Sequence, residues 1–196
     1  MILMSVFSST LSSLAISNAS TENLTKFSSL FAKWNRSINL SAATTADEIN
    51  EHIRDSLYVV PHLRGRGRVL DVGSGGGFPV VVAAICLPSC SFTALEPVHK
   101  KHAFLRTAAR ELGLTNLDAR AERLEDHAER DYNAAMSRAT FDLDRWLRSA
   151  LERVVPGGVV LGFEANRRED LTVPIERHAY DLAGKTRAIV VAVRPG

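Results

Sequence analysis

A glycine-rich turn at residues 71–79, with the sequence Asp-Val-Gly-Ser-Gly-Gly-Gly-Phe-Pro, limits the possible folds of this chain more than any other segment. A short β-branched run at residues 69–72 leads into the turn, and an apolar run of helical character at residues 79–87 follows it. Glycine allows the backbone of such a turn to approach a ligand closely, because no Cβ atom intervenes. In an open α/β sheet, ligands bind outside the carboxyl ends of the strands, where such turns lie. The turn therefore predicts an α/β fold with a ligand at this loop.

Strand and helix signals alternate through the rest of the chain. Further strand-like runs lie at residues 91–95, 134–137, 159–163 and 188–193, and further helical runs at residues 100–112 and 146–154. We expect Gly113 to end the first of these helices and the Pro-Gly-Gly at residues 156–158 to end the second. Strands that alternate with helices form a mostly parallel sheet with right-handed crossovers.

Residues 1–60 are predicted to be a helical extension that precedes a domain of residues 61–196. Apolar residues in this extension recur at spacings of three and four, which places them on one helix face: Leu24, Phe27, Leu30, Phe31 and Trp34. We place the start of this helix near Thr21, and we expect a second helix at about residues 47–58. The apolar face of each helix is expected to pack into the core.

Composition restricts the class of protein. The 196 residues, 45% apolar and 23% charged, are typical of one soluble globular domain with a small extension. The formal net charge of +2 gives no bulk attraction for nucleic acid, so any basic surface would have to be local. Cys86 and Cys90 have no partner pair for a four-ligand zinc site and suit a reducing compartment. No apolar run reaches the roughly 18 residues of a membrane span, so we expect a cytoplasmic protein without a metal or a membrane anchor.

The spacing within the turn distinguishes between two nucleotide cofactors. A dinucleotide-binding turn has glycine at its first, third and sixth positions, whereas Phe78 occupies the sixth position here. The carboxylate of Asp71 suits a cofactor that carries an ammonium group and would be a poor neighbour for a pyrophosphate. An acid followed by Gly73, Gly75 and Gly77 resembles motif I of the Rossmann-like methyltransferases.

Glu96 ends the next strand, where an acid can accept hydrogen bonds from ribose hydroxyls. NAD and S-adenosyl-L-methionine both contain a ribose, so Glu96 alone does not discriminate between them. The strand, loop, helix, second strand and acid together favour S-adenosyl-L-methionine, and an NAD-dependent oxidoreductase is the more distant alternative.

Several short segments, in their order and spacing, connect the chain with one family. They lie at residues 33–35, 38–40, 52–56, 71–79, 100–101, 104–105, 111–114, 120–122, 137–139 and 156–158. By these segments the chain resembles, from about residue 31 to residue 193, the RsmG/GidB family of bacterial methyltransferases that make 7-methylguanosine in 16S ribosomal RNA. The resemblance implies a Rossmann-like class I methyltransferase fold with a mostly parallel seven-stranded sheet.

The same resemblance implies the roles of individual residues. Gly73 and Phe78 would line the methionine and ribose end of the cofactor, Ala121 and Glu122 would bracket the adenine, and Arg138 would face the cofactor carboxylate or the target. The implied cofactor site is Asp71, Gly73, Ser74, Gly75, Gly77, Phe78, Glu96, Ala121, Glu122 and Arg138. The substrate-side candidates are Asn39, His52 and Arg138.

The chain departs from the family in two places. Val80 stands where the family usually has glycine, and Phe163-Glu164 stands where it usually has a Lys-Gly pair. We interpret Glu164 as an acid that replaces a cation at the rim and weakens phosphate attraction. A diverged paralogue that methylates another RNA or a small molecule, or a cofactor-binding protein without catalysis, therefore remains an alternative.

The chemistry of methyl transfer fits the lack of an obvious acid–base pair. Ring nitrogen 7 of guanine has a free lone pair and no proton, so positioning without a general base suffices. Amino-group methylation commonly uses an Asn/Asp-Pro-Pro-aromatic loop, whereas residues 137–140 are Ser-Arg-Ala-Thr. Carbon-5 methylation of pyrimidines needs a cysteine nucleophile near the site, and we expect both cysteines to lie away from it. The resemblance therefore implies a guanine methyltransferase that acts on ribosomal RNA or the small subunit, which we expect to be a monomer, and no catalytic residue is assigned.

Overall fold

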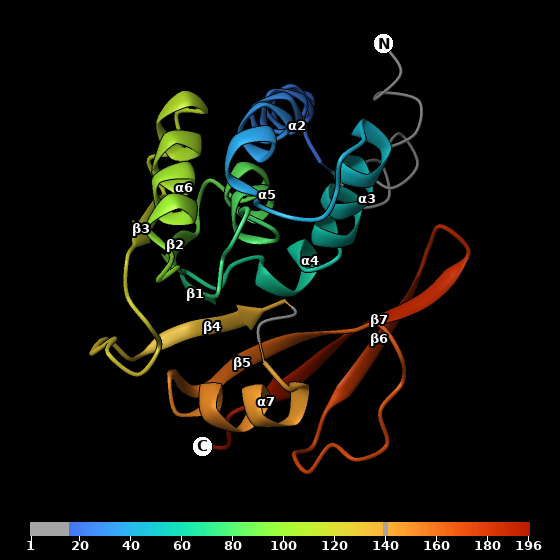
Figure 1. Ribbon diagram of the computed structural model, residues 1–196. Helices are drawn as coiled ribbons and strands as arrows, with labels where there is room; N and C mark the ends of the chain where they lie inside the picture. Colours follow the sequence, from blue (N-terminus) through green and yellow to red (C-terminus); the bar gives the residue numbers. More distant parts are fainter. Residues whose placement is uncertain (1–15, 139–140) are drawn as a thin grey trace.

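A computed structural model describes residues 16–138 and 141–196 of the chain. The central sheet has helices on both faces, with α2, α3, α4, α5 and α6 on one side and α7 on the other (Figure 1). The helices are α2 Asn18–Ile38, α3 Ala46–Leu57, α4 Val60–Leu63, α5 Val80–Cys86, α6 His99–Glu111 and α7 Leu143–Leu151. No helix within the described ranges has the length and apolarity that crossing a membrane requires.

The sheet has seven strands in the order β3-β2-β1-β4-β5-β7-β6. Its strands are β1 Arg68–Val72, β2 Ser91–Leu95, β3 Leu117–Arg120, β4 Tyr132–Ser137, β5 Val154–Glu164, β6 Glu176–Leu182 and β7 Lys185–Val193. The pairs from β3 to β5 are parallel, and β7 runs antiparallel to both β5 and β6. The predicted mostly parallel seven-stranded sheet is confirmed. The chain order reverses between β1 and β4, which is where ligands bind in folds of this kind.

Two of the seven strands, β3 and β6, had no predicted residue range, and one helix was predicted a few residues too far along the chain. β3 and β6 are the edge strands of the sheet, and most of their side chains are exposed or half-buried, so they contain no apolar run. The helix predicted at residues 146–154 is α7, which ends at Leu151. The Pro-Gly-Gly at residues 156–158 lies inside β5, where the pairing with β4 shifts register. A bulge accommodates a proline that a regular ladder would exclude.

The described part of the N-terminal segment is helical and shares one core with the sheet. Helix α2 begins three residues before the predicted Thr21 and is capped by Ser17, whose hydroxyl accepts a hydrogen bond from the Ser20 amide. Phe27 and Phe31 on this helix are fully buried. The prediction for residues 1–15 lies outside the described residues.

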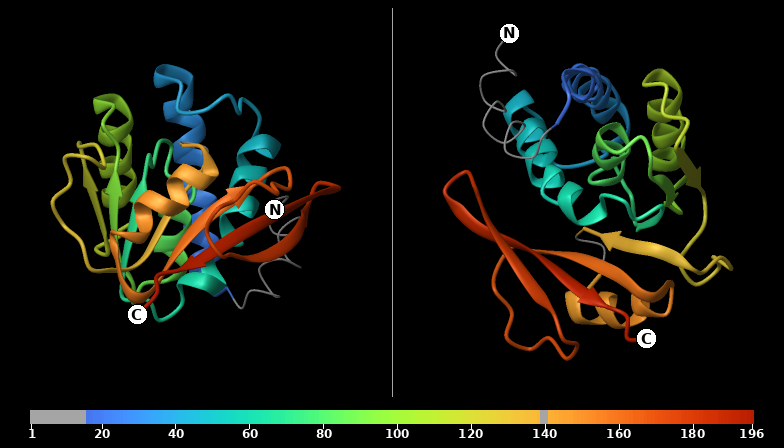
Figure 2. Two further views of the ribbon diagram at one scale, coloured as in Figure 1. Left: turned by 90° about the horizontal axis from the view of Figure 1, so that it is seen from below. Right: turned by 180° about the vertical axis from the view of Figure 1, so that it is seen from behind.

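The antiparallel hairpin of β6 and β7 extends beyond the other strands toward α3 (Figures 1 and 2). The ring of Tyr58, directly after α3, stacks on that of Tyr180 in β6 with centroids 3.9 Å apart. This contact joins residues from the first third of the chain to residues near its end. Segments that are far apart in the sequence thus hold the hairpin against α3.

Candidate functional site

The glycine loop between β1 and α5 is fixed from both sides. The Gly73 and Ser74 amides donate to the Leu95 carbonyl at 2.9 and 3.1 Å, which ties the loop to the end of β2. A Cβ atom at Gly77 would lie 2.5 Å from Val81, so packing excludes a side chain there. A Cβ atom at Gly75 would have its nearest neighbour at 3.7 Å, and Gly75 has a φ of +53°. Gly75 is therefore required by its backbone conformation and leaves the space above the loop open.

A cavity of about 570 Å³ opens above this loop. Six of the predicted residues line it: Gly73, Ser74, Gly75, Phe78, His52 and Arg138. Lining residues that the sequence analysis did not select are Leu40, Ser41, Asp55, Gly76, Lys101, Phe163, Glu164, Ala165, Tyr180 and Arg187. The cavity thus combines the loop with α3, the end of β4, β5, and the β6–β7 hairpin.

Other predicted residues lie outside this lining. Asp71 and Glu96 are buried at the ends of β1 and β2. Gly77 packs against Val81, as described above, and Ala121 and Glu122 follow β3. Asn39 lines a neighbouring groove instead.

Asp71 is the most unusual group near the loop. Its side chain is buried, and neither carboxylate oxygen accepts a hydrogen bond from the residues that the structure describes. Burial raises the pKa of Asp71 to about 7. The nearby Ser74 hydroxyl, which donates to the Asp71 backbone carbonyl and not to the carboxylate, and the Arg138 charge lower this pKa, whereas the Glu96 charge raises it. An unpartnered buried carboxyl is costly. A ligand that brings an ammonium group to this position would satisfy it, which fits the amino acid end of S-adenosyl-L-methionine.

Glu96 holds the loop against the next connection. One carboxylate oxygen accepts from the Gly75 amide and the other from the Val98 amide, both at 2.8 Å. Each carboxylate oxygen has a second lone pair, so a ribose hydroxyl can still donate to it. Val98 itself is 48% exposed, which is unusual here for a large apolar side chain. Its exposed surface beside Glu96 suits contact with a flat purine.

Asp55 connects the walls of the cavity. Its buried carboxylate accepts from Arg138 Nη1 at 3.1 Å, from the Tyr180 hydroxyl at 2.7 Å and from Arg187 Nη1 at 3.4 Å. Burial raises the pKa of Tyr180, and the Asp55 charge adds to this, so its hydroxyl stays protonated and donates. One carboxylate therefore joins α3 to β4, β6 and β7. Sequence reasoning included Asp55 in a family segment but did not assign it to the site.

Arg138 is held over aromatic rings. Its guanidinium carbon lies 5.4 Å from the Phe78 ring centroid and 6.0 Å from that of Phe163. His52 Nδ1 lies 3.5 Å from Arg138 Nη1. Burial lowers the pKa of His52, and the Arg138 charge lowers it further, so the imidazole is neutral at physiological pH. Arg138 is thus a fixed cation of the cavity, and Arg187, which also lines the cavity, is held by the same carboxylate.

Glu164 lines the cavity, but the interpretation that this acid weakens phosphate attraction is not supported, because its charge is paired. Its side chain is buried, and its carboxylate pairs with Arg177 Nε at 2.9 Å and accepts from the Arg168 amide at 2.9 Å. The charge is therefore neutralised within the protein. Val80, the other departure from the family, is fully buried in α5, where it packs into the core.

A second groove of about 610 Å³ adjoins the cavity. The two share Leu40, Ser41 and Lys101. Arg36 and Asn39 also line the groove, and its described lining includes no carboxylate. Asn39 has a φ of +52° and ends α2, so its backbone shapes the entrance to the groove. Arg36 and Lys101 thus give the groove a local positive charge next to the cavity.

The two cysteines are remote from this site. Neither lines the cavity or the groove. Burial raises the pKa of Cys86 to about 12, and the Cys90 thiol donates to the Leu63 carbonyl. Neither thiol is a nucleophile for this cavity.

Comparisons with known proteins identify the family of the chain. A model of the GidB family, described as rRNA small subunit methyltransferase G, matches residues 20–192. The ribosomal RNA small subunit methyltransferase G of Burkholderia vietnamiensis is 38% identical over 165 residues, which cover 80% of this chain and 72% of that protein. The protein of the same name from Burkholderia cenocepacia is 36% identical, with 87% and 86% covered.

Solved structures with the same fold are more distant in sequence. A putative O-methyltransferase from Klebsiella pneumoniae has a TM-score of 0.63 at 17% identity and covers 98% of this chain and 97% of its own. An RNA methyltransferase from Salinibacter ruber, in complex with S-adenosyl-L-homocysteine, has a TM-score of 0.55 at 18% identity, with 73% and 90% covered. At such identities the likeness establishes the fold.

Proposed function

The chain belongs to the rRNA small subunit methyltransferase G family and is thus an S-adenosyl-L-methionine-dependent rRNA methyltransferase; we propose that its target is ring nitrogen 7 of a guanine in small-subunit ribosomal RNA. The observation that best supports binding of the cofactor is the buried, unpartnered Asp71 carboxyl, which lies beside a cavity that contains a fixed arginine. An amino acid headgroup needs that pair of charges, because it carries an ammonium and a carboxylate.

The cofactor residues follow from this placement. Asp71 would receive the ammonium group, Arg138 the carboxylate, and Glu96 the ribose hydroxyls. Gly75 leaves room for the methionine chain, as the open space at its missing Cβ supports. Ala121 and Glu122 would border the adenine beyond the end of β3. When bound, the cofactor supplies a methyl group on a sulfonium centre.

The acceptor side needs positioning rather than proton transfer. Guanine N7 has no proton to lose, and positioning alone contributes much of the rate in such displacements. Of the acids that line the cavity, Asp55 and Glu164 are both engaged in ion pairs. Neutral His52 and the Phe163 ring offer a polar edge and an apolar face to a base.

The groove beside the cavity supports an RNA substrate. Arg36 and Lys101 line it and would meet phosphates, while Asn39 at its entrance would contact the backbone of the RNA. Phosphate contacts by arginine and lysine supply much of the affinity for nucleic acids. A chain of small net charge can therefore bind RNA locally. We further propose that it acts as a monomer in the cytoplasm, and that residues 1–60 shape the target side.

The test is methyl transfer from tritiated S-adenosyl-L-methionine. Naked 16S ribosomal RNA and isolated small subunits that lack 7-methylguanosine serve as acceptors, and nucleoside analysis follows. We expect label in 7-methylguanosine with at least one acceptor. Label in a different nucleoside would refute the assignment of the target atom. Cofactor binding without any transfer would refute catalysis on ribosomal RNA.

A further inference from the structure

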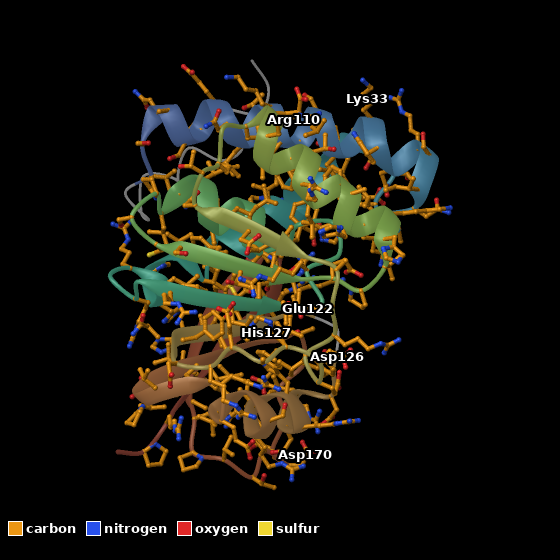
Figure 3. All side chains as sticks on the ribbon, turned by 90° about the vertical axis from the view of Figure 1, so that its left-hand side faces the viewer. Lys33, Arg110, Glu122, Asp126, His127 and Asp170 are labelled. Carbon is orange, nitrogen blue, oxygen red and sulfur yellow. The ribbon has the colours of Figure 1, made fainter. Side chains whose placement is uncertain are left out.

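Three side chains form a hydrogen-bonded row after the end of β3. Glu122 Oε1 lies 2.9 Å from His127 Nδ1, and His127 Nε2 lies 2.7 Å from the Tyr132 hydroxyl. His127 is 2% exposed and Tyr132 1%, whereas the Glu122 side chain is 29% exposed. Figure 3 shows Glu122 and His127 beside each other on the face that carries β3. The row runs from the interior of the sheet to the surface.

The chemistry of the row fixes its direction. A carboxylate accepts hydrogen bonds and does not donate them, so His127 Nδ1 carries the hydrogen toward Glu122. With the hydrogen on Nδ1, Nε2 is the nitrogen that accepts from the Tyr132 hydroxyl. The ring of His127 is held by Tyr132, the first residue of β4, and its backbone carbonyl is held by a hydrogen bond from Arg153. A histidine fixed in this way orients the group on its other nitrogen.

The oriented group faces the ligand edge of the sheet. The Glu96 amide donates to the Arg120 carbonyl at 3.0 Å, which aligns the ends of β2 and β3. Glu122 therefore follows β3 next to the acid that ends β2. Its Oε1 accepts from His127 and lies 4.0 Å from Arg120 Nη1, while no described residue donates to Oε2. Exposed Val98 lies on the same connection as Glu96. The edge thus presents an apolar surface and one available carboxylate oxygen.

We propose that His127 is a positioning residue that holds Glu122 as the acceptor for the 6-amino group of the cofactor's adenine. This inference rests on the proposed function, since it assumes that the adenine lies beyond the end of β3. Without His127 the glutamate would lose the 2.9 Å hydrogen bond that fixes its carboxylate, and only the longer contact with Arg120 would remain. The consequence is selectivity: a purine with an amino group at position 6 is favoured over one with a carbonyl oxygen, which would face the carboxylate oxygen with no hydrogen between them.

The test compares two ligands that differ at this one group, S-adenosyl-L-homocysteine and its deaminated analogue S-inosyl-L-homocysteine. Calorimetry on the full chain should show that the unmodified protein prefers the adenosyl ligand. His127→Ala should lower the affinity for the adenosyl ligand by about 10-fold, the order seen when orienting partners are removed. The affinity for the inosyl ligand should not change. His127→Asn should retain most of the preference, because its amide nitrogen can take the place of Nδ1.

Two controls separate orientation from folding. His102 Nε2 donates to the Ala119 carbonyl of β3 at 3.0 Å, and among the described residues it forms no hydrogen bond with Glu122. His102→Ala should therefore leave the preference intact. In a Glu122→Ala background, His127→Ala should have no further effect on binding, because the histidine acts through the glutamate.

The outcomes are distinguishable. Equal weakening of both ligands by His127→Ala, or additive effects of the two alanine variants, would show a merely structural histidine and overturn the inference. An unmodified protein that binds both ligands equally would overturn it as well. An unmodified protein that binds neither ligand would instead refute the proposed cofactor function, and this inference with it.

Discussion

Replacing Asp71 with asparagine should make the cofactor-free protein more stable at alkaline pH and unable to bind its cofactor well. The pKa of this carboxyl rises from an ordinary 3.8 to about 7, chiefly through burial. A raised carboxyl pKa means that the folded protein loses stability as the pH rises from about 4 to 7. The full loss is about 4 kcal/mol above pH 7, at about 1.4 kcal/mol for each pKa unit. Asparagine imitates the protonated carboxyl and avoids this loss.

Urea unfolding at pH 5.5 and pH 8.5 measures the effect. The advantage of Asp71→Asn over the unmodified protein should grow by about 2 kcal/mol between these two pH values. Exposed Asp126 provides the control, and Asp126→Asn should show no such growth. In the unmodified protein, binding of S-adenosyl-L-homocysteine at pH 7 should release about half a proton, because the ammonium group favours the ionised carboxyl. An advantage that is independent of pH, together with no proton release, would refute the argument.

Three further changes test the cavity. Gly75→Ala should reduce affinity for S-adenosyl-L-homocysteine by at least ~10-fold, whereas Gly113→Ala, with a similar positive φ and open space, should leave it unchanged in calorimetry. Arg138→Ala should lower methyl transfer by at least ~10-fold, about 1.4 kcal/mol, and Arg138→Lys should not fully restore it, because lysine lacks the planar fork; normal turnover in both would contradict the role. Glu164→Lys should lower the melting temperature by roughly 5 °C by placing two cations together at Arg177, and an unchanged melting curve would show that the ion pair is dispensable.

The position of the glycine loop and of Asp71 beside it could be predicted from the sequence, because their signals are local. The strand, the glycines, Asp71 and the following helix lie within one short segment, and backbone conformation alone limits what such a segment can do. Glu96 was predictable for the same reason, since it ends the next strand. The structure places all of them around one loop.

The side of the cavity that α3 and the β6–β7 hairpin form could not be predicted from local sequence patterns. Tyr180 and Arg187 hydrogen-bond to Asp55 across 125 and 132 residues of sequence, and Tyr180 lies on the edge strand β6, whose mostly exposed side chains give no apolar run. Glu164 shows the same limit for charge. The sequence shows that Glu164 is an acid, but it does not show that Glu164 pairs with Arg177, which lies on β6 of the hairpin. A charge can be read from a sequence, whereas its neutralisation depends on tertiary contacts.

The bridging role of Asp55 also has a consequence for the order of synthesis. During translation the N-terminal helices and the glycine loop emerge well before the β6–β7 hairpin, and domains fold as their segments become available. Asp55 can pair with Arg138 once β4 has emerged, but it gains the hydrogen bonds from Tyr180 and Arg187 only after the hairpin has been synthesised. A nascent chain that ends before β6 would have the cofactor loop without the far wall of the cavity. The enzyme would become competent at a late moment of its own synthesis, when the hairpin closes onto α3.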